Sequence, residues 1–129
     1  MDVKSREEII KFAQKLNSTN LSPLRSGNIS LKAQNNNEEG FLITPSGKKY
    51  DSLKGDDIVF VSLEGRYDEK GLQPSSEWRF HKDIYLKKAD AKAVVHAHSP
   101  HATAVSAHNK DIPAFHYMIA LAGGDNIKC

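Results

Sequence analysis

The chain has 129 residues, and its 18 Lys and Arg are nearly balanced by 16 Asp and Glu, so the formal net charge is only +2 with neutral histidines. This balance argues against a strongly polyanion-binding protein. With 39% hydrophobic and 26% charged residues, the composition is typical of one globular domain over residues 1–129 and excludes disordered and collagen-like chains.

Neither a membrane span nor a secretion signal is visible in the sequence. No apolar run approaches the roughly 18 residues that a spanning helix needs, and residues 1–8 lack the apolar segment of a signal peptide. We therefore expect a cytoplasmic protein. The one cysteine, Cys129, excludes an intramolecular disulfide and a cysteine-based metal cluster within one chain. Any metal site must use histidine and carboxylate ligands.

The first half of the chain alternates between helical and strand-like patterns. An opening amphipathic helix is predicted from the spacing of its apolar residues, with Ser5 and Glu8 at capping-box distance, and it is expected to pack against a sheet. A strand is predicted to begin at residues 27–31 and to be followed by a polar surface turn over 35–40. Buried strands are predicted over residues 41–44 and 57–62, and a tight turn at Glu64-Gly65. The apolar residues of the opening helix are Ile9, Ile10, Phe12, Ala13 and Leu16.

The second half continues this alternation. A helix is predicted over residues 77–88, with hydroxyls suited to capping at Ser75 and Ser76, followed by a strand that ends at His96. Another helix is expected to begin at Pro100, and a short helix over 117–122 to end at Gly123-Gly124. Ile127 is expected to begin a last strand. Mixed helices and strands of this kind indicate an α/β sandwich.

Histidines are concentrated late in the chain, and two of them have metal-ligand spacing. His96 and His98 lie two residues apart on a predicted strand, which directs both imidazoles to one face. A catalytic zinc ion typically has two such nitrogens, a third protein ligand and an open coordination position. Two satisfied or solvent-facing histidines at a sheet end fit the pair equally well. The other late histidines, for which surface or capping roles are the simpler expectation, are His101, His108 and His116.

Glu77 has two interpretations. At the start of its predicted helix, a carboxylate is favoured by the helix dipole for structural reasons alone. Alternatively, the carboxylate faces a metal across a cleft, acting first as a ligand and then as a general base. The spacing leaves both interpretations open.

Three small polar turns could together form a phosphate site. Backbone N–H groups, amide and hydroxyl side chains and glycine can bind phosphate without much cationic charge. No Walker loop or dinucleotide fingerprint is present, and each turn taken singly is compatible with an ordinary connection. The turns are Gly27-Asn28, Thr44-Pro45-Ser46-Gly47 and Ser75-Ser76.

Taken together and in order, these motifs resemble the class II aldolase/adducin family over nearly the whole chain. The matching runs are Ser26-Gly27-Asn28-Ile29-Ser30, Phe41-Leu42-Ile43-Thr44-Pro45-Ser46-Gly47, Pro74-Ser75-Ser76-Glu77-Trp78, Val94-Val95-His96-Ala97-His98-Ser99, and the later stretch from Ile112 to Ala120 with Gly123-Gly124. The resemblance implies a three-layer α/β/α sandwich with a largely antiparallel central sheet, C-terminally truncated relative to the family. It also implies a homotetramer with active sites at subunit interfaces.

The resemblance further implies an activity and residue roles. The expected reaction is metal-dependent cleavage of a ketose 1-phosphate, similar to L-fuculose 1-phosphate, to dihydroxyacetone phosphate and an aldehyde. His96, His98 and Glu77 would bind one Zn²⁺ per subunit, with Glu77 also the catalytic acid/base. Tyr117 would reach a neighbouring subunit's site and assist the aldehyde half. The substrate phosphate would be bound by Asn28, Thr44, Ser46, Gly47, Ser75 and Ser76.

Family members continue beyond Gly123-Gly124 with a segment that normally carries a third histidine ligand, and a chain truncated before this segment could be inactive. This leaves open a truncated gene product, a deliberately shortened chain, or a chain completed by oligomerisation. The competing functions are a pentulose-phosphate epimerase or a dehydratase of the same fold, and a non-catalytic, adducin-like assembly module. Glu77 favours the aldolase branch over the epimerases, which tend to have aspartate there. The metal and phosphate motifs argue against the assembly module.

Overall fold

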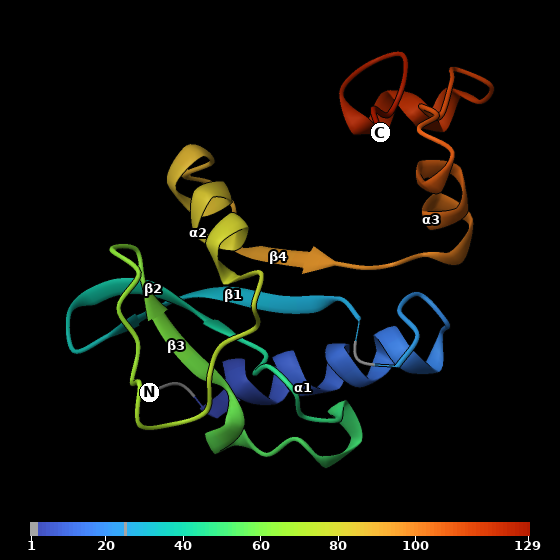
Figure 1. The fold of residues 1–129 in the computed structure, drawn as a ribbon. Coiled ribbons are helices and arrows are strands. Elements are labelled where there is room, and N and C mark those ends of the chain that lie inside the picture. Colours follow the sequence, from blue (N-terminus) through green and yellow to red (C-terminus); the bar gives the residue numbers. More distant parts are fainter. Residues whose placement is uncertain (1–2, 25) are drawn as a thin grey trace. The chain divides into compact units, whose positions relative to one another are not determined.

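A four-stranded antiparallel sheet forms the centre of the first part of the chain (Figure 1). The computed structural model describes residues 3–24 and 26–129. It divides the chain into two compact units, the first ending at Ala97 and the second running from His98 to Cys129. The single domain expected over residues 1–129 stays a prediction. The strands, in the spatial order β3-β2-β1-β4, are β1 (Asn28–Asn35), β2 (Glu38–Ile43), β3 (Val59–Ser62) and β4 (Ala93–His96).

The hairpin between β1 and β2 is tighter than the predicted polar turn over 35–40. Asn36 and Asn37 both have positive φ, +48° and +65°, as the two central residues of a type I′ turn require. Asn35 already pairs with Glu38, so the strands extend to within two residues of each other. The prediction was too wide because the polar residues that flank the turn lie in the strands.

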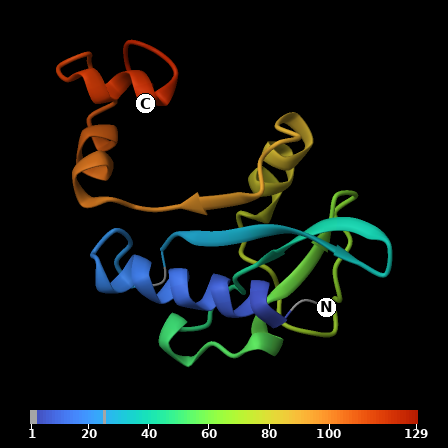
Figure 2. The same cartoon turned by 180° about the vertical axis from the view of Figure 1, so that it is seen from behind.

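Helix α1 (Val3–Ser18) lies along one face of the sheet (Figure 2). Its buried residues Ile9, Ala13 and Leu16 join a core cluster with Ile29 and Leu42 of the sheet, which confirms the predicted amphipathic helix. The capping-box prediction was wrong: Ser5 is the third residue of the helix and therefore cannot be its N-cap.

Helix α2 (Trp78–Lys87) covers the opposite face. Trp78 and Tyr85 pack in a second core cluster with Phe41 and Ile43, whereas Leu42, between them in β2, belongs to the first. This alternation along one strand follows from the two-residue period of strand side chains. Helix, sheet and helix thus form three layers, and all three strand pairings are antiparallel, which confirms the predicted α/β fold class.

Two predicted boundaries in this unit need correction. Strand β3 begins at Val59, two residues later than predicted, because Gly55–Asp57 form a 3₁₀ turn in which Asp57 Oδ2 accepts the Lys54 N–H at 2.6 Å. Helix α2 begins at Trp78, so Glu77 is its N-cap and does not lie in its first turn. Among the predicted capping hydroxyls, Ser75 Oγ accepts a long hydrogen bond from the Glu77 N–H, at 3.4 Å.

The second unit contains α3 (Pro100–Ala107), with Pro100 in the first helical position, and the 3₁₀ helix η3 (Tyr117–Ala122). Both confirm the predicted helices, and η3 ends at Gly123 with φ +86°. Ile127 begins no strand, because it forms only an isolated bridge with Ile112. Within the described ranges 3–24 and 26–129, no helix is long and apolar enough to cross a membrane.

Candidate active site

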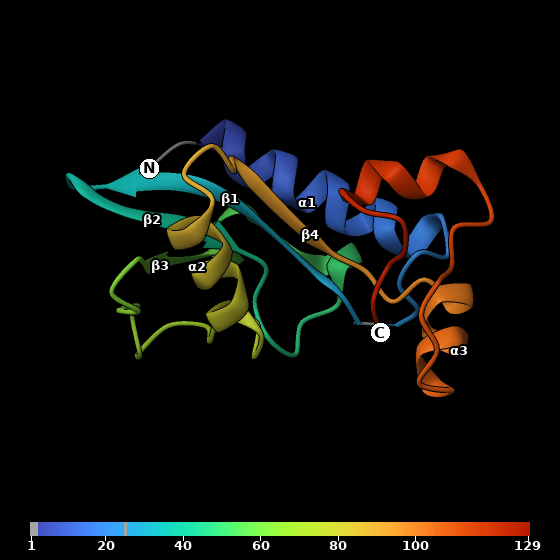
Figure 3. The same cartoon turned by 90° about the horizontal axis from the view of Figure 1, so that it is seen from above.

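Antiparallel pairing brings the beginning of β1 beside the end of β4 (Figure 3). Asn28, the first residue of β1, is registered with His96, the last residue of β4. Gly27 precedes Asn28 with φ +79°, and a Cβ on Gly27 would lie 2.6 Å from the backbone oxygen of His96. The sequence therefore needs glycine here, because only a residue without Cβ allows this approach at that φ.

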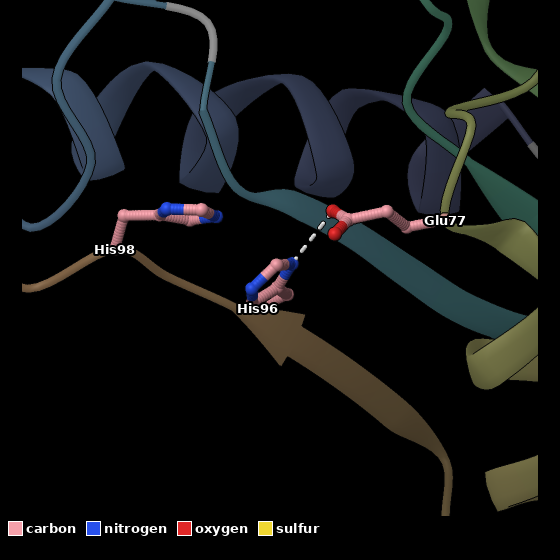
Figure 4. Close-up of side chains that lie close together, drawn as sticks. All are labelled: Glu77, His96 and His98. Carbon is pink, nitrogen blue, oxygen red and sulfur yellow. Dashed lines mark hydrogen bonds and ion pairs between the residues drawn. The ribbon is translucent and has the colours of Figure 1, made fainter. Parts of the chain in front are cut away.

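The Glu77 carboxylate points at this strand end from the N-terminus of α2 (Figure 4). Its Oε2 accepts hydrogen bonds from Asn28 Nδ2 at 2.6 Å and His96 Nδ1 at 2.8 Å. Glu77 is the N-cap residue of α2, yet its side chain makes no capping hydrogen bond. The side chains of Glu77 and His96 are 40% and 26% exposed, so solvent and small molecules can reach them. The geometry therefore favours the second interpretation, a carboxylate directed at the histidines.

Glu77, His96 and His98 can each offer one ligand atom, and these three atoms all lie within 4.8 Å of one another (Figure 4). The prediction that both histidines lie on the strand was wrong for His98, because β4 ends at His96. One intervening residue nevertheless keeps His98 close to the strand end. Two imidazole nitrogens and one carboxylate oxygen form a donor set typical of catalytic zinc, with bonds of about 2.0–2.2 Å. The residues present therefore fit the metal.

The other late histidines do not belong to this group of described residues. His101, His108 and His116 are exposed residues of the second unit. The Nδ1 of His116 accepts the Met118 N–H at 3.2 Å and caps η3, which is the capping role considered for it. Tyr117, the first residue of η3, is 81% exposed.

Two of the three polar turns are joined by backbone hydrogen bonds. Ser46 N–H donates to Gln73 at 2.9 Å, and Ser75 N–H donates to Thr44 at 3.0 Å. The Thr44 hydroxyl accepts a hydrogen bond from the Ile29 N–H at 3.3 Å, which links these two turns to β1. The third turn, Gly27-Asn28, lies at the beginning of the same strand.

The predicted phosphate ligands differ in exposure. Thr44 and Ser75 are buried, whereas Ser46, Gly47 and Ser76 are exposed. A Cβ on Gly47, which has φ +74°, would meet no other atom within 4 Å. The exposed members therefore face solvent, whereas Thr44 and Ser75 do not.

Sequence reasoning missed three buried polar residues behind Asn28. His81 Nε2 bonds to Asn28 Oδ1 at 2.5 Å, His81 Nδ1 bonds to Ser30 Oγ at 2.7 Å, and Ser30 Oγ bonds to the Tyr85 hydroxyl at 2.8 Å. The available signal was spacing: His81 and Tyr85 follow Glu77 at four-residue intervals on a helix, and Ser30 follows Asn28 by two on a strand.

Burial controls the protonation of this group. Burial is the main cause that lowers the pKa of His81 to about 4, with the nearby His96 contributing and Glu77 opposing. Burial also raises the pKa of Tyr85 to about 12, against hydrogen bonds with Ser30 and the Val94 backbone. At neutral pH, both side chains are therefore uncharged.

The chain is similar to known proteins over nearly its whole length. The chain is 45% identical to the L-fuculose phosphate aldolase of Escherichia coli K12 over 126 residues, covering 98% of this chain and 56% of the relative. It is 42% identical to a 5-methylthioribulose-1-phosphate/5-deoxyribulose-1-phosphate aldolase of Rhodospirillum rubrum over 123 residues, covering 95% and 53%. A solved L-fuculose 1-phosphate aldolase matches with a TM-score of 0.87 and 34% identity, covering 99% of this chain and 59% of that one.

The chain spans just over half the length of these relatives. The family model described as the class II aldolase and adducin N-terminal domain matches residues 7–129. With this match and the identity to the curated aldolases, the chain belongs to the class II aldolase and adducin family.

Proposed function

We propose that the chain provides the N-terminal part of a zinc-dependent aldolase that cleaves a ketose 1-phosphate to dihydroxyacetone phosphate and an aldehyde. The observation that carries this proposal is the Glu77 carboxylate, held by Asn28 and His96 with a ligand atom of His98 in the same group. The substrate class is supported by the printed names of the relatives, which act on phosphorylated ketoses such as L-fuculose phosphate and 5-deoxyribulose 1-phosphate.

His96, His98 and Glu77 would hold the ion. When bound, Zn²⁺ supplies Lewis-acid stabilisation of negative charge that develops on substrate oxygens. Glu77 has the position and the solvent access to transfer a proton at the reacting carbon. In cleavage, Glu77 would accept the proton of the C4 hydroxyl as that oxygen becomes the aldehyde oxygen. The C3–C4 electron pair would pass to C3, and Glu77 would return the proton to C3.

The polar turns would fix the other end of the substrate. Asn28, Thr44, Ser46, Gly47, Ser75 and Ser76 are the proposed phosphate ligands. Nδ2 of Asn28 carries two hydrogens, and one of them is directed at Glu77, so the same amide can serve both groups. A phosphate bound here would convert remote binding energy into orientation of the reacting carbons.

The proposed role of Tyr117 and the proposed homotetramer rest on the family resemblance alone. Tyr117 would act in a neighbouring subunit's site of a homotetramer. Its exposure is compatible with an intersubunit role, and light scattering of the purified chain measures the assembly directly. The cytoplasmic location stays a prediction.

The test begins with a zinc titration of the metal-free 129-residue chain, with affinity measured by competition with a chelator. We expect tight binding of about one ion per chain, the stoichiometry of a three-ligand site. The same sample is then assayed for dihydroxyacetone phosphate released from L-fuculose 1-phosphate and 5-deoxyribulose 1-phosphate.

The matched variant is Glu77→Gln, which keeps the size of the side chain. We expect it to keep the fold and to abolish cleavage. Full turnover by Glu77→Gln would exclude the proposed acid/base role. Epimer or alkene products in place of an aldehyde would assign the chain to the epimerase or dehydratase branch. A folded chain without affinity for zinc or for either sugar phosphate would favour the adducin-like assembly module.

A further inference from the structure

A single line of hydrogen bonds runs from the second core cluster to the candidate metal centre. It begins at Tyr85, a member of that cluster, and passes through Ser30, His81 and Asn28 to Glu77 at distances of 2.8, 2.7, 2.5 and 2.6 Å. All five residues belong to the first unit. The line connects β1 and α2 inside the protein and ends at the only member that is substantially exposed, the 40% exposed Glu77 carboxylate.

The hydrogen bond from Asn28 to Glu77 determines which atom donates and which accepts in every other bond of this line. The NH₂ group of the Asn28 amide donates to Glu77 Oε2 at 2.6 Å, since an amide nitrogen can only donate. The carbonyl oxygen of Asn28 therefore faces His81 and can only accept from an Nε2–H. In a neutral imidazole, the other nitrogen is then an acceptor, so the Ser30 hydroxyl donates to His81 Nδ1. The Tyr85 hydroxyl in turn donates to Ser30 Oγ.

Burial removes water as an alternative partner for the inner members. His81 and Ser30 are completely buried, and Tyr85 and Asn28 are 2% and 3% exposed. An unmade hydrogen bond in such surroundings costs free energy that water cannot compensate. The lowered pKa of His81 and the raised pKa of Tyr85 keep both residues in the neutral forms that this directed line requires.

We propose that His81 is a positioning residue, whose Nε2–H determines which end of the Asn28 amide faces Glu77 and thereby holds the carboxylate in place for the metal. An amide turned by 180° would direct its oxygen at the carboxylate, and two acceptors would oppose each other. The consequence at zinc rests on the proposed function. The orientation of the Asn28 amide does not depend on the proposed function, because it follows from contacts in the metal-free chain.

The first arm of the test is therefore spectroscopic and uses the metal-free chain. Proton–nitrogen correlation spectra of an isotope-labelled sample are expected to show His81 protonated on Nε2 and not on Nδ1. The Asn28 side-chain amide is expected to give two resolved signals with slow hydrogen exchange. His81→Leu removes the donor and should accelerate this exchange, whereas His81→Gln, whose amide nitrogen can take the place of Nε2, should preserve it.

The second arm measures zinc affinity by chelator competition. Loss of a group that orients a metal ligand typically costs roughly 10–100-fold in affinity, so we expect a loss of this size for His81→Leu and affinity near that of the unaltered chain for His81→Gln. Val61→Ala is the matched control. Val61 is completely buried in the second core cluster, so this variant lowers stability without removing a hydrogen bond of the line and should leave zinc affinity unchanged.

The inference is overturned if His81 carries its proton on Nδ1, if the Asn28 amide signals are the same in His81→Leu, or if Val61→Ala lowers zinc affinity as much as His81→Leu. A failure of the proposed function gives a different result: the unaltered chain would then neither bind zinc nor cleave ketose 1-phosphates, while the tautomer and amide results would still hold.

Discussion

Asn28 and Glu77 are 49 positions apart in the chain, yet the side-chain amide of the first donates to the carboxylate of the second at 2.6 Å. Asn28 begins β1, and Glu77 caps α2, the helix that covers this face of the sheet. This hydrogen bond has one direction, because the donor, Asn28, lies on the strand and the acceptor, Glu77, lies at the start of the helix. Exchanging or removing the donor should therefore change the stability of the chain.

The variant Asn28→Asp tests the polarity directly. It replaces the donor that faces Glu77 by a second carboxylate of the same shape, and at pH 8 two ionised carboxylates at this distance repel each other. We expect the free energy of unfolding of the metal-free chain, measured by urea denaturation, to fall by about 1–3 kcal/mol, the usual cost of losing one partner of a partly buried polar pair.

The control is the double variant Asn28→Asp with Glu77→Gln, which restores one donor and one acceptor with their positions exchanged. It should recover most of the lost stability, because the coupling between two contacting residues appears as non-additivity. A double variant as unstable as the sum of its single changes would show that the two side chains do not interact.

His81 should make the stability of the chain depend on pH. In the unfolded chain it takes up a proton near its ordinary pKa of 6.5, whereas in the folded chain it does so only near 4. Between these values the unfolded state binds more protons, so the free energy of unfolding falls as pH falls from about 6.5 to 4. The shift corresponds to a loss of at most about 3 kcal/mol.

Urea denaturation at several pH values measures this loss, and His81→Gln is the control because it has no titrating ring. The pH dependence of the variant should be flatter across the same window. Asp57 does not interfere: hydrogen bonds from Lys48 and Lys54 outweigh its burial and lower its pKa below 3.8, so its contribution is lost only at more acidic pH. Equal slopes for the two chains would contradict the buried, neutral His81.

Much of the fold could be predicted because its elements carry local periodic signals. Ile9, Ala13 and Leu16 recur at helical intervals and are buried together, and the apolar run in β2 supplies both faces of the sheet. The ends of the elements were less predictable. Ser5 has capping-box spacing within a helix that begins at Val3, because the same short pattern is also compatible with the interior of a helix.

The candidate site was only partly predictable, for a related reason. The sequence indicates that Glu77 and His96 belong to functional motifs, but their spacing does not determine whether the carboxylate caps its helix or faces the histidine. That choice depends on how α2 packs on the sheet. The burial of His81 behind Asn28 depends on the same long-range packing. The four-residue spacing of His81 from Glu77 therefore does not by itself predict the hydrogen bond to Asn28.

The close approach at Gly27 predicts a mutational effect on both stability and metal binding. A Cβ there would lie 2.5 Å from Ser22 Oγ and 2.6 Å from the His96 backbone oxygen, at φ +79°. The left-handed conformation alone costs a residue with a Cβ about 1–2 kcal/mol, and relief of the clash must displace His96. We therefore expect Gly27→Ala to lower both the melting temperature and the zinc affinity.

Gly123→Ala is the matched substitution. Gly123 has a similar φ of +86°, but its added Cβ would meet no atom within 4 Å. It should show the conformational cost in the melting temperature and leave zinc affinity unchanged. If Gly27→Ala binds zinc as tightly as Gly123→Ala, the contact between Gly27 and the His96 backbone does not position the metal centre.

His98 provides the last prediction, because it is the histidine of the triad that lies outside β4. Its ligand atom lies within 4.8 Å of those of Glu77 and His96, although β4 ends two residues earlier. If it is a ligand, His98→Ala should weaken zinc binding by more than the roughly 10–100-fold that loss of a ligand's supporting partner costs. The exposed His108 is the control, and chelator competition should give His108→Ala the affinity of the unaltered chain. Unchanged affinity in His98→Ala, together with loss of binding in His96→Ala, would assign the third position to a group other than His98.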